Sequence, residues 1–359
     1  LGLSVSVAVG GFLNLTGSIS KNSVLFFLSA GWLLFLISLI LENRRLFNSI
    51  KNFWQQVKAR KILAMLTMLL IGIVLIRYSS SVAFFGFHGT DDQHAYMVFP
   101  AKMLQIGALG NDPFSERRIV SSLGGGYFLN TFVLTGANFK NLHLMENGIG
   151  FIIFLMVLIG FLKDRKTSLN FSLAVLLLAS IIPSPSGNIT SFFSVAVLFM
   201  AILRFILLKD EEKQKKAILF ALSFFVATLY ILKSNVIFTA AILFLSYFVL
   251  GLKDGVKRAT VAKELIFAVI IIFVIMLPWM ISMKNSSGTW LYPFLGKGYE
   301  GSVYGTFLSH YLEISKYSFL RIISEIIFGL CLFIPFTGLG VVWLLAKNST
   351  AKKTVLFFL

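Results

Sequence analysis

Long apolar runs recur along the whole sequence and constrain the fold more than any other feature. A helix needs about 20 apolar residues to cross a bilayer, and backbone in contact with lipid must be helical because hydrocarbon satisfies no free amide. Of the 359 residues, 57% are apolar and 13% are charged, and the mean hydropathy is +0.86. These values exclude a soluble domain with a polar surface. The sequence predicts an all-α fold, a polytopic bundle of transmembrane helices.

Ten spans are predicted, and an eleventh begins at Thr354. The ten cover residues 1–15, 23–41, 62–85, 148–162, 168–182, 189–208, 217–232, 236–252, 265–283 and 322–346. Several are short for a span, which tilted or broken helices would explain. Because the sequence starts without methionine and stops inside a new apolar run, we expect it to be a fragment of a longer protein.

Positive charge is concentrated in the linkers that alternate along the chain. Of the 32 lysines and arginines, 20 lie in the segments ENRRLFNSIKNFWQQVKARK, KDRK, KDEEKQKK, KDGVKRATVAKE and KNSTAKK. Basic loops of this kind face the cytoplasm, so the net charge of +17 is a consequence of topology and requires no nucleic acid. We therefore divide the chain into N-terminal helices (1–76), an outer loop (77–147), a central bundle (148–283), a second outer loop (284–319) and C-terminal helices (320–359).

The first outer loop contains a polar segment that is unusual in so apolar a chain. Its sequence TDDQHAYMVFPAKMLQIG predicts a helix that lies in the membrane interface, with Thr90 as the N-cap. The predicted apolar face consists of Tyr96, Phe99, Met103 and Ile106. A turn, ALGNDPFS, and the segment ERRIVSSLGGGYFLNTFVLTG follow; the glycines of the latter predict a tight turn or a close approach between helices.

The adjacent acids Asp91 and Asp92 allow two interpretations. Aspartate is favoured near a helix N-terminus, so both residues are consistent with capping. A carboxylate at a membrane boundary is also suited to act as general base toward a hydroxyl, or to bind a divalent cation such as Mg²⁺ or Mn²⁺ that carries phosphate. His88 and His94 flank the pair, and the spacing HGTDDQH could assemble metal ligands, but interfacial loops also accept histidine readily, so the histidines do not favour zinc.

Several further outer residues are candidates for substrate binding. Arg117 and Arg118 are suited to phosphate, because guanidinium groups bind its oxygens through paired hydrogen bonds, although snorkelling to lipid headgroups explains them equally well. The second outer loop is rich in aromatic residues and glycine, which fits an interfacial belt or stacking on a sugar. The predicted substrate-binding residues are His94, Tyr96, Lys102, Arg117, Arg118, Lys297, Tyr299 and Glu300.

Other classes of function have less support. Ionisable residues within the spans are few and lie near the ends, namely Arg77, Arg204, Lys233, Arg321 and Glu325, which argues against a proton-coupled carrier. The sequence has no nucleotide-binding loop, no HExxH and no Gly-x-Ser-x-Gly motif. Its single cysteine, Cys331, excludes a disulfide framework within this chain.

The first outer loop resembles that of the GT-C class of polytopic glycosyltransferases. The resemblance covers about forty residues: an acidic pair after a span, an aromatic residue, a short interfacial helix ending in glycine, then DPFSERR and a glycine-rich return. It implies that Asp91 or Asp92 is the catalytic or metal-binding acid, supported by the other, and that the donor is a sugar on a lipid phosphate. In this class the acidic loop follows the first span, whereas at least two apolar segments precede it here.

These observations predict an inverting glycosyltransferase of the cytoplasmic membrane with its active site on the non-cytoplasmic side. It would transfer a sugar from a polyprenyl-phosphate donor to a glycan, lipid or protein acceptor. A polysaccharide polymerase or ligase shares such substrates, and a flippase of lipid-linked sugars or a structural membrane component are the alternatives from other classes.

Overall fold

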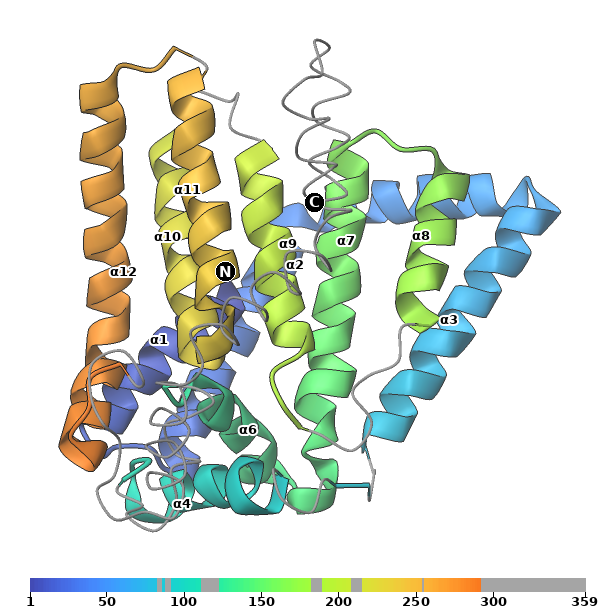
Figure 1. Cartoon of the computed structure of the whole chain (residues 1–359). Coiled ribbons are helices and arrows are strands. Elements are labelled where there is room, and N and C mark those ends of the chain that lie inside the picture. The colour runs from blue at the N-terminus through green and yellow to red at the C-terminus, as the bar shows by residue number, and fades with distance from the viewer. Residues whose placement is uncertain are drawn as a thin grey trace, which may run out of the picture. The chain divides into compact units, whose positions relative to one another are not determined.

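The nine apolar runs before residue 291 form helices in a computed structural model of the chain (Figure 1). The structure describes residues 1–82, 86–87, 92–110, 123–181, 189–207, 215–253 and 255–291, and no strand occurs among them. The all-α prediction is confirmed. The predicted spans at 322–346 and from Thr354 lie outside the described residues.

Four helical segments are long and apolar enough to cross a membrane. They are Lys21–Arg44 within α2 (Lys21–Lys58), α3 (Lys61–Val82), Phe139–Asp164, and α12 (Arg258–Ser287). Shorter apolar helices are α1 (Gly2–Leu15), α8 (Leu169–Ile181), α9 (Phe193–Leu207), α10 (Lys215–Leu232) and α11 (Ile237–Lys253). Only 6% of the apolar window of α2 and 11% of that of α3 is buried inside the protein. Lipid must cover the rest, because so much exposed apolar surface is not stable in water.

Several boundaries differ from the predicted ones. The predicted linker that begins at Glu42 is helical, since α2 continues to Lys58. This stretch contains neither proline nor glycine, so nothing in it stops the helix that Ser20 and Ser23 begin with a capping box. The span predicted to begin at residue 148 starts inside a π-helix, η3 (Leu144–Gly150), which leads directly into α7 (Phe151–Asp164).

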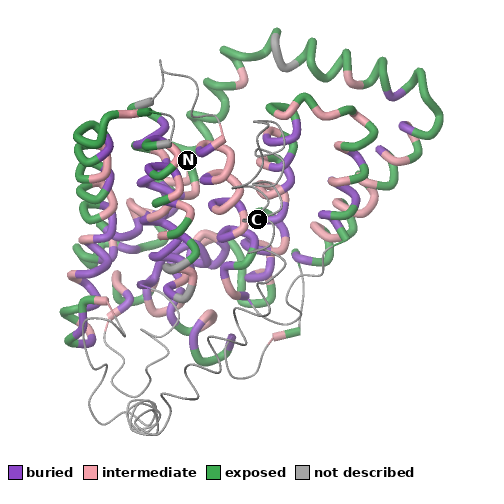
Figure 2. The backbone as a smooth tube through the Cα atoms, turned by 45° about the horizontal axis from the view of Figure 1, so that its top comes forward, coloured by how far each residue is buried: buried purple, intermediate pink, exposed green. Residues whose placement is uncertain are grey.

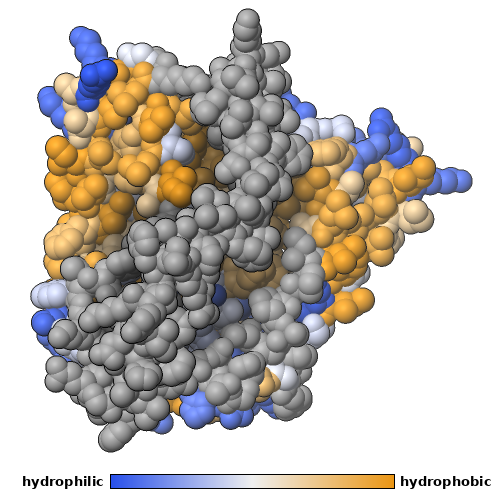
Figure 3. All heavy atoms as spheres, in the orientation of Figure 1, coloured by the Kyte–Doolittle hydropathy of each residue, from blue (hydrophilic) through white to orange (hydrophobic). Residues whose placement is uncertain are grey.

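The two ends of the bundle carry different connections. The α7–α8 and α11–α12 connections lie at one end, at the top of Figure 1, and contain lysines and arginines such as Arg165, Lys166 and Lys257. We call this the basic end. At the opposite end, here the site end, α4 (Val98–Ile106) and α6 (Gly125–Gly136) follow α3 in the chain (Figure 1). Apolar side chains cover the sides of the bundle between the two ends (Figure 3).

Helix α6 lies in the core although it belongs to the predicted outer loop. It contacts α1, α4 and α10, and side chains such as Tyr127, Phe128 and Thr131 are fully buried. The contrast with the exposed α2 is visible in Figure 2. Trp279 of α12 closes this core by donating a hydrogen bond from Nε1 to the carbonyl oxygen of Val7 over 3.0 Å. The first outer loop therefore contributes a central helix to the fold, and this helix fixes the position of the site.

Candidate functional site

Asp92 joins two segments of the site end that are far apart in the chain. It begins the π-helix η1 (Asp92–Tyr96), and its side chain is fully buried. Its Oδ1 accepts a hydrogen bond from the backbone N–H of Ile189 over 2.9 Å. Asp92 does lie in a first helical turn, as the capping interpretation predicted, but this contact crosses to the segment before α9. The neighbouring Asp91 lies outside the described residues.

The single interfacial helix predicted around Asp92 is two elements. The N–H of Met97 bonds to the carbonyl of Asp92, five residues back, over 2.8 Å, and α4 then begins at Val98. Pro100 explains the restart, because it has no N–H and is tolerated only in the first turn of an α-helix. Phe99, which belongs to the predicted apolar face, is fully buried in the protein.

The residues of the predicted apolar face differ in burial toward the end of α4. Met103 of that face is fully buried in the protein, whereas Ile106 is 57% exposed. Gly107 ends the helix with φ of 82°, and a Cβ there would lie 2.0 Å from the carbonyl oxygen of Gly17. Only glycine fits this position, so α4 ends where the α1–α2 connection meets it.

Thr190 is the point at which three segments meet. Its Oγ1 accepts a hydrogen bond from the Tyr96 hydroxyl over 3.2 Å and another from the Lys233 ammonium over 3.0 Å. Tyr96 comes from η1, whereas Lys233 directly follows α10. Thr190 is next to Ile189, whose N–H binds Asp92. The Asp92 carboxylate and the Lys233 ammonium therefore bind consecutive residues.

A second buried acid, Glu146, lies in η3 and is 97% shielded from solvent, with 3% of its surface exposed. Its carboxylate accepts hydrogen bonds from the backbone N–H and the hydroxyl of Ser194, over 2.9 and 2.6 Å. Ser194 is the second residue of α9, so Glu146 satisfies donors at the start of that helix. We call Asp92, Tyr96, Glu146, Thr190, Ser194 and Lys233 the polar cluster.

Burial and charge act in opposite directions on Lys233. Removal from water lowers the pKa of its ammonium, and the negative charge of Glu146 partly opposes that shift. Lys233 is only half-buried, unlike the two acids. The Lys233 ammonium binds Thr190 in a less buried position than the two carboxylates.

The glycines at the start of α6 allow this helix to pack closely against the residues around Thr190. A Cβ at Gly126 would lie 2.6 Å from the Ser191 hydroxyl oxygen, which is closer than real side chains come. Gly126 thus lets the first turn of α6 pack against the segment that carries Thr190. The predicted role of these glycines in a close helix approach is confirmed at Gly125, where a Cβ would lie 2.8 Å from Ile231 of α10.

The histidines offer no metal site in the described part of the chain. His143 is buried, and its Nε2 lies 2.9 Å from the carbonyl oxygen of Gly86 while its Nδ1 contacts Asn147 over 3.1 Å. Its ring stacks on Phe87 with centroids 5.0 Å apart. Within the described ranges, no three residues among His, Cys, Asp and Glu are grouped as metal ligands. The possible Mg²⁺ or Mn²⁺ therefore remains a prediction, because Asp91 and His88 lie outside those ranges.

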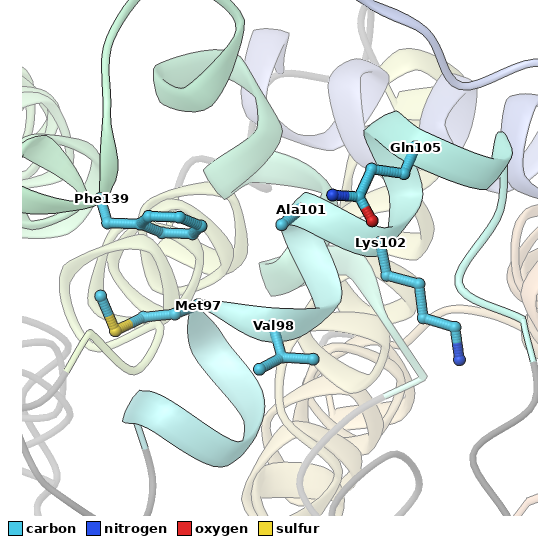
Figure 4. Close-up of a pocket in the computed structure, with 6 residues that line it drawn as sticks. All are labelled: Met97, Val98, Ala101, Lys102, Gln105 and Phe139. Atoms are coloured by element: carbon cyan, nitrogen blue, oxygen red, sulfur yellow. The ribbon is translucent and has the colours of Figure 1, made fainter.

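The structure brings only some predicted substrate-binding residues together. Tyr96 belongs to the polar cluster, whereas His94 is exposed. Lys102 lines an open hollow of about 380 Å³ with Met97 and Phe139, and its ammonium points away from both (Figure 4). Five predicted residues lie outside the described ranges: Arg117, Arg118, Lys297, Tyr299 and Glu300.

Sequence reasoning missed both Glu146 and the role of Lys233. Lys233 was noted as an ionisable residue near the end of a span, and Glu146 was placed at the end of a loop. The available signal was their position, since a charged residue at the margin of an apolar run is costly unless it has a partner. No family model, curated protein or solved structure matches the chain.

Proposed function

We propose that this chain is an integral membrane glycosyltransferase that uses a sugar donor linked to a lipid phosphate. The reaction would take place at the site end, on the non-cytoplasmic side of the cytoplasmic membrane. The acceptor would be a hydroxyl or amide of a glycan, lipid or protein. The GT-C-like pattern of the first outer loop and the concentration of lysine and arginine at the basic end support the proposal.

One observation carries the proposal: an acid and a cation converge on adjacent residues. Asp92 binds the N–H of Ile189, and Lys233 binds the hydroxyl of Thr190. Transfer from a lipid phosphate needs a base for the acceptor and a positive charge for the departing phosphate. The polar cluster holds groups of both kinds at one end of an apolar bundle.

In the proposed reaction, the acceptor oxygen attacks the anomeric carbon and gives its proton to a carboxylate of the acidic pair. The bond between that carbon and the phosphate oxygen breaks, and the lipid phosphate leaves with the bonding electrons. The Lys233 ammonium stabilises the negative charge of the phosphate. Both effects are stronger at the edge of the bilayer than in water, because the local dielectric constant is lower.

The burial of Asp92 suggests which of Asp91 and Asp92 acts as the base and which supports it. The Asp92 carboxylate is fully buried and already holds the segment before α9, so a supporting role suits it. Asp91 then takes the proton. Replacing the base is expected to slow transfer by about 10²–10⁴-fold, and replacing Asp92 is expected to slow transfer and also to lower stability.

The test is sugar transfer by purified full-length protein in nanodiscs, with radiolabelled polyprenyl-phosphate sugars as donors. Wild type would be compared with Asp91→Asn and Asp92→Asn. Asp164→Asn serves as a matched control, because Asp164 pairs with Arg204 at the basic end. Loss of transfer in the first two variants alone, with Asp91→Asn folded normally, would support the proposal.

Other outcomes would favour the alternative functions. Wild-type transfer in both acid variants would make the arginine pair the candidate machinery, as expected for a polymerase or ligase. Movement of labelled lipid across the bilayer without bond cleavage would indicate a flippase. If neither transfer nor movement occurs with any donor, the proposal is wrong.

A further inference from the structure

Both buried acids of the polar cluster lie in π-helices, which are rare and occur often at functional sites. Asp92 begins η1, and Glu146 lies in the first turn of η3. Each reaches out of its own helix to the stretch between Ile189 and Ser194. Glu146 was absent from the sequence-based candidates, so its role needs a separate argument.

Capping alone explains only part of the environment of Glu146. Ser194 gives the carboxylate two hydrogen bonds, which satisfy donors at the start of α9. A neutral glutamine or asparagine would accept hydrogen bonds there without the cost of burying a charge. The negative charge is also felt by Lys233, which binds Thr190 four residues before Ser194.

We propose that Glu146 is a positioning residue for Lys233: it anchors the start of α9, keeps Thr190 in place, and attracts the Lys233 ammonium so that it meets the phosphate of a lipid-linked ligand. This inference rests on the proposed function, because it takes the lipid phosphate as the ligand. It adds a role for Glu146 that the acidic pair does not supply. Glu146 itself makes no contact with the ligand in this scheme.

Four charged or titratable groups of the described residues are connected to Lys233. The charge of Glu146 in η3 acts on it, Tyr96 of η1 shares Thr190 with it, Asp92 of η1 binds the adjacent Ile189, and Tyr230 precedes it by three residues. Of these, Glu146 is the group whose charge raises the pKa of Lys233 against the effect of burial. Without that charge, Lys233 loses its proton at a lower pH, and with it the attraction for phosphate.

The experiment measures binding of polyprenyl phosphate without a sugar to the full chain in nanodiscs, between about pH 6 and pH 10. Wild type should bind less tightly above the pKa of Lys233. In Glu146→Gln, the midpoint of this loss should move to lower pH. In Glu146→Gln combined with Lys233→Arg, binding should persist at alkaline pH, because a guanidinium stays protonated.

Asp164→Asn is the matched control. It removes a carboxylate charge at the basic end, where Asp164 pairs with Arg204, so it should leave the midpoint of binding unchanged. An equal shift of the midpoint in Asp164→Asn would overturn the positioning role. An unchanged midpoint in Glu146→Gln would overturn it as well.

The outcomes separate this inference from the proposed function. If the pH shift occurs in a protein that transfers no sugar, Glu146 positions Lys233 for a lipid phosphate but the glycosyltransferase proposal fails. If transfer occurs and the midpoint does not depend on Glu146, only the inference fails. If wild type binds no polyprenyl phosphate at any pH, both are wrong.

Discussion

The two ends of the bundle handle charged residues in opposite ways. At the basic end, charged side chains lie near the surface: the ion pair of Asp164 and Arg204 spans 2.5 Å, with side chains 27% and 36% exposed. At the site end, Asp92 and Glu146 are buried and bind backbone N–H groups of another segment. Exposed charge of the first kind is typical of a solvated surface, whereas buried and partnered charge of the second kind is the arrangement from which the candidate site is inferred.

The largest expected effect tests whether the two ends face opposite sides of the membrane. In a background with Cys331→Ser, Lys140→Cys at the site end should react with a membrane-impermeant maleimide in intact cells freed of their outer wall. Lys163→Cys at the basic end should react only after permeabilisation. The reverse pattern would place the polar cluster on the cytoplasmic side and contradict the proposed location.

The next effect compares two lysines of the site end. Lys233→Met should reduce sugar transfer by about 10²–10³-fold, since it removes a charge that stabilises the leaving phosphate. Lys140→Met should have little effect, because Lys140 is exposed and outside the polar cluster. Initial rates in nanodiscs measure both. Equal rates for the two variants would separate Lys233 from the reaction.

A smaller effect concerns packing beneath the cluster. Gly126→Val should destabilise the protein by about 1–3 kcal/mol, because its side chain would overlap Ser191. Gly136→Val, in the same helix, adds its side chain where no atom lies within 4 Å, and should cost much less. Thermal unfolding in detergent measures the difference. Similar losses would show that helix propensity dominates at both positions.

The smallest effect is expected at the basic end. Asp164→Asn should change the free energy of unfolding by less than about 1 kcal/mol, because a partly exposed ion pair contributes little. Sugar transfer should remain at the wild-type rate. A large loss of stability would show that the basic end is more than a solvated surface, and would weaken the contrast between the two ends.

The sequence predicted much of the fold because the physical signal is local. Apolar length alone located nine helices, with errors where it cannot register helix continuation, as in α2 beyond Glu42. It also identified the segment around Asp92 and the buried Phe99 and Met103. The spacing did not separate Phe99 and Met103, which are buried in the protein, from Ile106, which is exposed, because helical spacing does not show where a neighbouring element stops.

The site was less predictable because its contacts join residues far apart in the chain. Asp92 and Ile189 are 97 residues apart, and Glu146 and Ser194 are 48 apart. Neither pair leaves a local pattern. The same limit applies to the π-helices, whose five-residue hydrogen bonds depend on how each segment is anchored by its surroundings.

By itself the sequence determined that this protein is a membrane bundle of α-helices. Backbone N–H and C=O groups inside hydrocarbon must be hydrogen-bonded within the chain, and a helix satisfies them within each apolar run. The sequence also determined that one polar segment interrupts the apolar runs. Tertiary structure alone decided that Asp92, Glu146 and Lys233 belong to one cluster. The reason is that buried charges must find partners, and those partners lie on helices that meet only after the bundle has packed.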